Sequence, residues 1–270
     1  VSRIKHIKAP KVGMAHLSRV HDREYIDSLF KSSPQSGCIA LDQDTLMMSH
    51  TLMAALHAAG AVVKAVDLVM SGQFIRAFCG VRPPGHHAKR DQAMGFCYFN
   101  NIAVGVAYAC SQYDLKRVAI VDFDVHHGNG TQNLFFSSNK VLYISTHQYP
   151  HFPGTGSHSE KGKFNNVLNV PLVSGTNSRE YFDAYENVLK KIKDFKPEFL
   201  LFSAGFDAHK EDPLSNINLK SEDFYEITKR TLLVANDYCK GKTVSVLEGG
   251  YNLNALAEST EQHLKALITF

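Results

Sequence analysis

The chain has 270 residues, of which 44% are hydrophobic and 20% charged, and its formal net charge at pH 7 is +3. This composition is ordinary for a soluble enzyme, and the length allows one large α/β domain with a sizeable core. The sequence contains no block of lysine or arginine that would follow a phosphate backbone, so it does not indicate nucleic-acid binding.

The cysteines and the hydrophobic runs of the sequence indicate the cellular compartment in which we expect the protein. The five cysteines are an odd number without a Cys-x-x-Cys pair, which argues against a disulfide framework or a zinc ribbon and favours a reducing, cytoplasmic location. No run of about 18 apolar residues is present to span a membrane, and the first residues (VSRIKHIKAPK) lack the apolar core of a signal peptide. The sequence begins with Val1 instead of Met, as we expect of a trimmed piece.

Predicted strands and helices alternate along most of the chain. Residues 1–44 show only a short helical pattern around 22–30, whereas residues 45–70 have the spacing of a largely buried helix. The remaining predicted elements are strands at 74–80, 117–123, 141–147, 166–171, 198–205 and 243–249, and helices at 99–112, 178–195 and 221–239, the last two opened by Ser178 and Ser221 as N-cap candidates. This rhythm predicts a mostly parallel sheet with helices on both faces, and no repeat or linker divides it, so we expect one α/β domain over residues 1–270.

Polar side chains follow the strand at 117–123, where Asp122, Asp124 and His126 come after an apolar run. In open α/β sheets the carboxyl ends of parallel strands border the crevice where ligands bind. Asp124 and His126 can therefore offer an oxygen and a nitrogen to one metal ion. The alternative for a lone Asp-x-His is a polar strand end that caps the next helix and its loop.

Asp207, at the end of the apolar strand 198–205, is the obvious third ligand. Its alternative role is a cap for a turn or helix. Three protein ligands with one open position are typical of catalytic zinc, although an Asp-His-Asp set is hard enough for Fe(II) or another divalent ion. Such a site would lower the pKa of a bound water to about 7.

The pair His86-His87 follows Pro-Pro-Gly after the strand at 74–80 and supplies two imidazoles for proton transfer. We expect His87 to act as general base and then acid, with His86 alongside it and oriented by a buried carboxylate, most plausibly Asp122. Asn129 is the candidate partner of His87; being neutral, it would orient the ring without raising its pKa as an aspartate could. Alone, a His-His pair is equally typical of an ordinary loop.

Tyr251 follows Glu248-Gly249-Gly250, where paired glycines let one side chain approach the metal. Its phenol could donate a hydrogen bond to a carbonyl oxygen and to the oxyanion that forms on it. The alternative is a tyrosine packed after a turn. Phe96 and Phe152 lie in Gly- or Pro-rich loops and could wall a narrow apolar passage, although phenylalanine is more often simply part of the core.

Seven motifs in this order resemble the histone deacetylase family, most closely its class II and bacterial amidohydrolase-like branch. They are RPPGHHA at 82–88, GFCYFNN at 95–101, DFDVHHGNGTQ at 122–132, FPGTG at 152–156, AGFDAH at 204–209, DPL at 212–214 and EGGYN at 248–252. The resemblance implies the arginase/deacetylase-like fold and zinc-dependent hydrolysis of an acylated amine such as acetyl-lysine or an acetylpolyamine.

The resemblance also implies roles for individual residues. Asp124, His126 and Asp207 would hold zinc, His86 and His87 would be the tandem histidines, and Tyr251 would polarise the carbonyl. The substrate tunnel would be lined by Phe96, Phe152, Leu214 and Gly250, with the Gly95 carbonyl accepting the substrate amide N–H. Potassium would bind at two places, one near Asp122, Asp124, His126, Ser145 and Thr146 and the other near Phe135 and Val141.

Some positions refine the resemblance. Asn129 stands where class I members carry Asp. The Arg82-Pro83-Pro84 segment that precedes the tandem histidines is another class II feature. Tyr251 replaces the histidine of members with weak activity on acetyl-lysine, which favours a competent deacetylase. The family's first strand and loop normally precede the region seen here, and residues 1–44 show no match to them, so we expect that a lead-in is missing.

Two other functions compete with this interpretation. An arginase-like ureohydrolase needs two manganese ions and added carboxylates where this chain has Gly128 and His209. A binding module for acylated lysine would be expected to have lost a metal ligand, His87 or Tyr251, yet all are present. The natural substrate, the acyl-chain preference and the oligomeric state cannot be read from the sequence.

Overall fold

The computed structural model describes residues 4–270. Its main sheet has six strands in the order β3-β8-β7-β4-β5-β6, and every neighbouring pair is parallel. The strands are β3 (Arg76–Cys79), β4 (Val118–Asp122), β5 (Val141–Gln148), β6 (Val167–Leu172), β7 (Phe199–Ala204) and β8 (Thr243–Leu247). All six predicted strands of the sheet are present, which confirms the α/β fold class.

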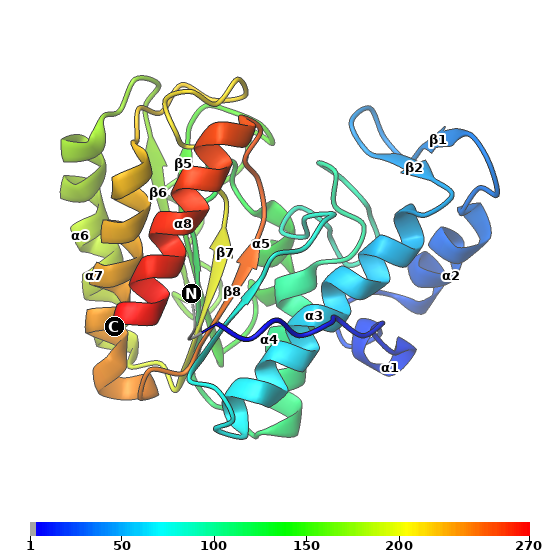
Figure 1. Cartoon of the computed structure of the whole chain (residues 1–270), viewed down its shortest axis with the longest axis horizontal. Helices are drawn as coiled ribbons and strands as arrows, with labels where there is room; N and C mark the ends of the chain where they lie inside the picture. Colours follow the sequence, from blue (N-terminus) through cyan, green and yellow to red (C-terminus); the bar gives the residue numbers. More distant parts are fainter. Residues whose placement is uncertain (1–3) are drawn as a thin grey trace.

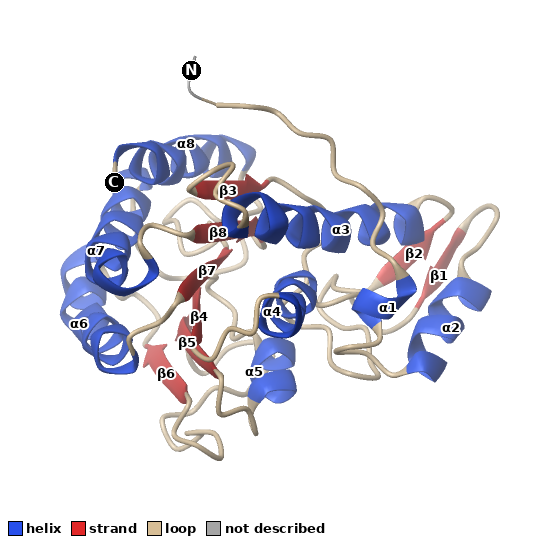
Figure 2. Ribbon diagram, turned by 90° about the horizontal axis from the view of Figure 1, so that it is seen from below, coloured by secondary structure: helices blue, strands red, loops and turns tan. Residues whose placement is uncertain are grey.

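Helices cover both faces of the sheet (Figure 2). One face carries α3 (Thr51–Met70), α4 (Asn101–Gln112) and α5 (Asn129–Phe135), and the other carries α6 (Ser178–Phe195), α7 (Ser221–Cys239) and α8 (Leu253–Thr269). Beyond α3 lie α1 (Met14–Leu17), α2 (Arg23–Ser32) and a small antiparallel hairpin of β1 (Cys38–Ala40) and β2 (Leu46–Met48) (Figure 1).

The central strand β4 shows why the sheet needs two layers of helices. Successive side chains of a strand point to opposite faces. Val118 and Ile120 pack into the core beneath α3 and α4, whereas Ala119 and Val121 pack into the core beneath α6, α7 and α8. All four side chains are fully buried, so an uninterrupted apolar run is the pattern that this position in the sheet requires.

The beginnings of two helices differ from the prediction. The N-caps are Asn177 and Lys220, one residue before the predicted Ser178 and Ser221, which are the first helical residues. The Asn177 side chain accepts hydrogen bonds from the N–H groups of Arg179 and Glu180, and an amide oxygen at this position satisfies two otherwise unpaired donors.

The predicted helix over 45–70 was wrong at its start, because residues 46–48 form strand β2 and α3 begins at Thr51. Tertiary contacts decide this: the Tyr98 hydroxyl donates to the Leu46 carbonyl and the Phe96 N–H to the Thr45 hydroxyl. By length and apolar composition α3 could cross a membrane, contrary to the expectation that no such run exists; however, 61% of its most apolar window is buried inside the fold, as in a core helix.

The parallel arrangement brings the carboxyl ends of β4, β7 and β8 together, because these strands are neighbours in the sheet. Residues that follow β4 therefore lie close to residues that follow β7, although about 80 positions separate them in the sequence. The five cysteines are free, so no disulfide contributes to this arrangement.

A buried histidine makes the stability of the fold depend on pH. His263 is fully buried on α8; its ring bonds the Thr228 hydroxyl at 2.6 Å and the Ser245 hydroxyl at 2.8 Å, and four phenylalanine rings surround it at centroid distances of 5.7 to 5.8 Å. Burial lowers its pKa from 6.5 to about 3. Because the folded protein favours the neutral ring, the unfolded chain takes up the proton first as the pH falls below 6.5.

We therefore predict that the contribution of His263 to the free energy of unfolding is largest above pH 6.5 and is lost as the pH falls toward 3. His263→Gln should reduce the slope of this decrease by about 1.4 kcal/mol per pH unit. Urea unfolding of both proteins at several pH values between 4 and 7 measures the slopes, and parallel slopes would contradict the assignment. The remaining slope is a sum of opposing contributions. Other histidines whose pKa burial lowers, such as His21, His127 and His147, add to the decrease, whereas the buried acids Asp207 and Glu248, whose pKa burial raises, act against it.

Candidate active site

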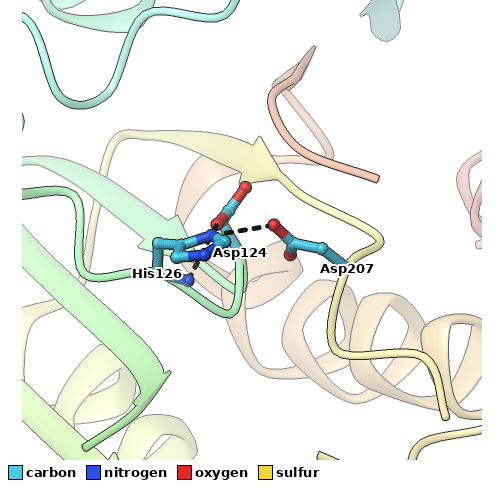
Figure 3. Close-up of side chains that lie close together, drawn as sticks. All are labelled: Asp124, His126 and Asp207. Atoms are coloured by element: carbon cyan, nitrogen blue, oxygen red, sulfur yellow. Dashed lines mark hydrogen bonds and ion pairs between the residues drawn. The ribbon is translucent and has the colours of Figure 1, made fainter. Parts of the chain in front are cut away.

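Three potential metal ligands converge at the ends of β4 and β7. Asp124 and His126 lie in the loop that follows β4, and Asp207 lies in the loop that follows β7 (Figure 3). One ligand atom from each residue lies within 4.8 Å of the other two, and all three residues are buried. The structure thus brings together the three ligands that were predicted from separate stretches of the sequence.

The spacing of these atoms fits a small divalent cation. His126 Nδ1 lies 3.0 Å from Asp207 Oδ2 and 3.2 Å from Asp124 Oδ1. In a tetrahedral zinc site, bonds of about 2.0 Å place neighbouring ligand atoms about 3.3 Å apart. The donor set of two carboxylate oxygens and one imidazole nitrogen is also one that Zn²⁺ and Fe²⁺ accept.

Electrostatics at the cluster favour a positive charge between the two carboxylates. Burial and the nearby charge of Asp124 raise the pKa of Asp207 to about 7. Burial would lower the pKa of the His126 ring, but its hydrogen bonds to Asp124 and Asp207 outweigh burial and raise that pKa to about 10. The cluster therefore demands a proton or a cation, and a divalent cation supplies the larger charge.

Backbone groups fix the two carboxylates in place. Asp124 Oδ2 accepts the Gly249 N–H at 2.8 Å, and Asp207 Oδ1 accepts the Val125 N–H at 2.8 Å. A Cβ atom at Gly249 would lie 2.3 Å from Asp207 Oδ2 and 2.6 Å from Asp124 Oδ2. Only glycine at position 249 therefore allows the backbone this close to both ligands.

The tandem histidines lie beside the cluster and have different partners. His86 Nδ1 lies 3.1 Å from Asp122 Oδ2, and His87 Nδ1 lies 2.8 Å from Asn129 Oδ1. Both pairs agree with the partners that the sequence predicted. The His87 ring lies 6.1 Å from the His126 ring, centroid to centroid, which places it next to the metal ligands.

The surroundings make one ring positively charged and leave the other neutral. Burial lowers the pKa of the His86 ring, but the charges of Asp124, Asp122 and Glu248 outweigh burial and hold that pKa well above 6.5. Burial and the neighbouring His86 charge hold the pKa of His87 well below 6.5. His87 is therefore the neutral ring, which can accept a proton.

Tyr251 faces the same cluster from the loop after β8. Its ring lies 6.5 Å from the His126 ring and 6.0 Å from the Phe96 ring, centroid to centroid. Burial and the charges of Asp207 and Asp124 raise the pKa of the phenol, so the hydroxyl stays protonated and can donate a hydrogen bond. The N–H of Tyr251 donates to Asp212 at 2.7 Å, which fixes the backbone that carries this ring.

The predicted tunnel residues lie around this cluster and are partly exposed. The Phe152 ring lies 5.2 Å from the His87 ring, and a Cβ at Gly95 would lie 3.2 Å from the Phe152 ring. Phe96, Phe152 and Leu214 are each about 40% exposed, and their role as tunnel walls stays a prediction. Gly250 has a φ of +135°, a backbone conformation for which glycine is suited.

Three residues at the site had no role in the sequence analysis. His151 stacks on His126 with ring centroids 5.0 Å apart and bonds the Leu214 carbonyl at 3.0 Å. Asp212 and Glu248 hold backbone N–H groups of the site loops. The FPGTG, DPL and EGGYN motifs contain or adjoin these residues, but side-chain partners so distant in sequence leave no local pattern.

The two predicted potassium positions have different surroundings. Asp122 and Ser145 are partners in the parallel register of β4 and β5, and both are fully buried. At the second position, Asn166 Nδ2 donates to the carbonyls of Phe135 at 2.9 Å and Val141 at 3.0 Å. Each of these two carbonyl oxygens has a second lone pair that could bind a cation. Potassium at both positions stays a prediction.

The fold and the cluster together define the arginase/deacetylase class of α/β proteins. A solved structure of the HDA15 HD domain matches 98% of this chain and 77% of its own chain, with a TM-score of 0.91 and 36% sequence identity. Within residues 4–270, Asp124, His126 and Asp207 are the one group of three such side chains close enough together to share an ion.

Comparison with known sequences identifies the family. The histone deacetylase domain model matches residues 1–267. A type-2 histone deacetylase of Dictyostelium discoideum is 37% identical over 96% of this chain, which covers 18% of that protein. A probable deacetylase of Archaeoglobus fulgidus is 38% identical over 93% of this chain and 70% of its own length. An uncharacterised Synechocystis protein is 41% identical over 94% of this chain and 81% of its own length. This chain belongs to the histone deacetylase family, a family of amide-hydrolysing enzymes.

The close approach of Gly249 to both carboxylates generates a test of the metal site. Gly249→Ala should lower the affinity for zinc by about 10- to 100-fold, because the added Cβ displaces Asp124 and Asp207 from their shared position. Competition with a chromophoric chelator measures this affinity directly on the purified protein. Activity need not be known for this measurement.

Gly80→Ala is the matched control, because Gly80 also follows a strand, β3, but an added Cβ would touch only the Phe78 ring at 3.4 Å. This variant should bind zinc as the wild type does. Equal zinc affinity in all three proteins would show that Asp124 and Asp207 do not hold the ion.

Proposed function

We propose that this protein is a zinc-dependent deacetylase that removes an acetyl or other acyl group from an acylated amine such as acetyl-lysine. The observation that supports the proposal most is the convergence of the Asp124, His126 and Asp207 ligand atoms beside His87 and Tyr251. Family membership supports the same reaction type. Zn²⁺ is the proposed metal, and Fe²⁺ is the alternative for the same donor set.

The cation, when bound to these three residues, would polarise the substrate carbonyl and lower the pKa of a water molecule. The side chains around it then have separate tasks. Phe96 and Phe152 would enclose the slim acylated arm of the substrate, and the Gly95 carbonyl would accept its amide N–H. These residues orient the scissile amide and exclude bulk water from it.

His87 is the proposed proton carrier. Its Nδ1 bonds the neutral Asn129, and its low pKa leaves the ring uncharged. The other ring nitrogen can accept the proton of the attacking water and return it to the departing amine. His86, held in the charged form by Asp122 and Asp124, would contribute positive potential beside the oxyanion.

Tyr251 is the proposed oxyanion stabiliser. Its raised pKa keeps the phenol protonated, so it can donate to the carbonyl oxygen as negative charge develops there. The backbone N–H bond from Tyr251 to Asp212 and the Gly249-Gly250 turn direct this side chain toward the site.

The experiment is a turnover assay on the zinc-loaded protein with an acetyl-lysine peptide, an acetylpolyamine and a simple acylated amine. We expect hydrolysis of at least one of them by the wild type. Tyr251→Phe should keep the zinc and lose about 100-fold in turnover, because one donor to the oxyanion is removed.

Metal analysis of the same samples is the control, and Tyr225→Phe is the matched substitution with no expected effect, because this half-buried ring lies on α7 beside Phe270. If the wild type binds zinc and these acylated amines but hydrolyses none, the chain is a binding module. If Tyr251→Phe is as active as the wild type, Tyr251 has no part in the reaction.

A further inference from the structure

A buried carboxylate outside the metal cluster joins three parts of the active site. Glu248 follows β8 directly and is only 5% exposed. Within the described part of the chain it forms no ion pair with lysine or arginine, so its hydrogen bonds must stabilise it. Those hydrogen bonds reach two other segments of the site.

Each oxygen of Glu248 has its own partners. Oε2 accepts the N–H of Gly85 at 2.7 Å and the N–H of His86 at 3.2 Å. Oε1 accepts the hydroxyl of Ser203, on the neighbouring strand β7, at 2.9 Å. One side chain thus connects the end of β8 to β7 and to the turn that carries the tandem histidines.

The turn at Gly85 and His86 contacts both α4 and Glu248. A Cβ at Gly85 would lie 2.4 Å from the backbone nitrogen of Asn101, so the start of α4 packs tightly against the turn. Both N–H groups of the turn are buried and have Glu248 as their acceptor. Without that acceptor the turn must move to satisfy them, because unpaired buried N–H groups are costly.

Movement of this turn would displace His87, which is the next residue along the chain. His87 owes its place beside the metal ligands to the backbone before it and to the Asn129 bond. A displacement of about 1 Å is enough to lower the rate of a proton transfer by about 100-fold. The position of His87 therefore depends on what holds Gly85 and His86.

We propose that Glu248 is a positioning residue for the tandem histidines, acting as the hydrogen-bond acceptor that fixes the backbone of Gly85 and His86. This proposal rests on the proposed deacetylase function. All three of its hydrogen bonds come from backbone N–H groups or the Ser203 hydroxyl, and none from His86 or His87 side chains. The role of Glu248 is therefore to accept hydrogen bonds from the turn and from Ser203. It does not carry the proton that moves between water and the departing amine.

Two substitutions of nearly equal length separate these roles. Glu248→Gln keeps an oxygen acceptor for the turn, and its amide group can donate to Ser203. Glu248→Met removes the acceptor. We expect Glu248→Gln to stay within about threefold of wild-type kcat, and Glu248→Met to lose at least about tenfold in kcat with little change in KM and with zinc content preserved.

Ser203→Ala controls for a purely structural role, because it removes the partner of the other oxygen and leaves the turn held. It should lower the unfolding midpoint while kcat stays close to that of the wild type. A large loss of kcat in folded Glu248→Gln would overturn the proposal, and so would full activity in Glu248→Met. If Glu248→Met does not fold, the Gln and Ser203→Ala variants still decide the question.

The wild-type protein in the same assay separates this proposal from the proposed function. If the zinc-loaded wild type does not hydrolyse any acylated amine, the deacetylase function fails and kcat cannot report on Glu248. In that case the chemical shifts of the His86 and His87 ring protons still report the position of the turn. They should be unchanged in Glu248→Gln and shifted in Glu248→Met, and the opposite pattern would overturn the positioning role.

Discussion

Two aspartates lie side by side in the interior of this protein, and their mutual repulsion is the constraint on which the site depends. Asp124 and Asp207 are both buried, each within 3.2 Å of the same imidazole nitrogen of His126. Two carboxylates cannot remain ionised at such a distance in a medium of low polarity unless a positive charge lies between them. The parallel sheet brings this pair together, because β4 and β7 are neighbours and end at the same edge.

The loop after β8 supplies most of what keeps this arrangement in place. Gly249 donates its N–H to Asp124, Glu248 accepts from the turn that carries the tandem histidines, and Tyr251 presents its phenol to the cluster. Three residues of one short loop thus contact Asp124, hold the backbone that precedes His87 and place a phenol ring beside His126. Such concentration explains why the loop needs two glycines, one for close approach and one for its positive φ.

The sheet, and the meeting of Asp124, His126 and Asp207 in space, could be predicted from the sequence because both leave local signals. Apolar runs that end in Asp or His mark buried strands with polar carboxyl ends, and strand neighbours place those ends together. The His86–Asp122 and His87–Asn129 pairs could also be anticipated, since their residues flank the same two strand ends.

Other features could not be predicted from the sequence because they depend on contacts between distant residues. Glu248 lies more than 160 positions from the turn it holds, and no periodicity marks such an acceptor. The hairpin at residues 38–48 was hidden because Leu46 also fits the apolar spacing of the helix that follows it. The contacts of Thr45 and Leu46 with residues 96–98 decide the outcome. Helix α8 was missed although Asn252 caps it and Ala255, Ser259 and His263 follow at helical spacing.

Anomalous diffraction at the zinc absorption edge, from crystals of the zinc-loaded protein, tests the central claim most directly. We predict a single strong peak bonded to Asp124, His126 and Asp207, at about 2.0 to 2.2 Å from each ligand atom. A map without a peak between these three side chains, or with zinc bound only elsewhere, would contradict the account.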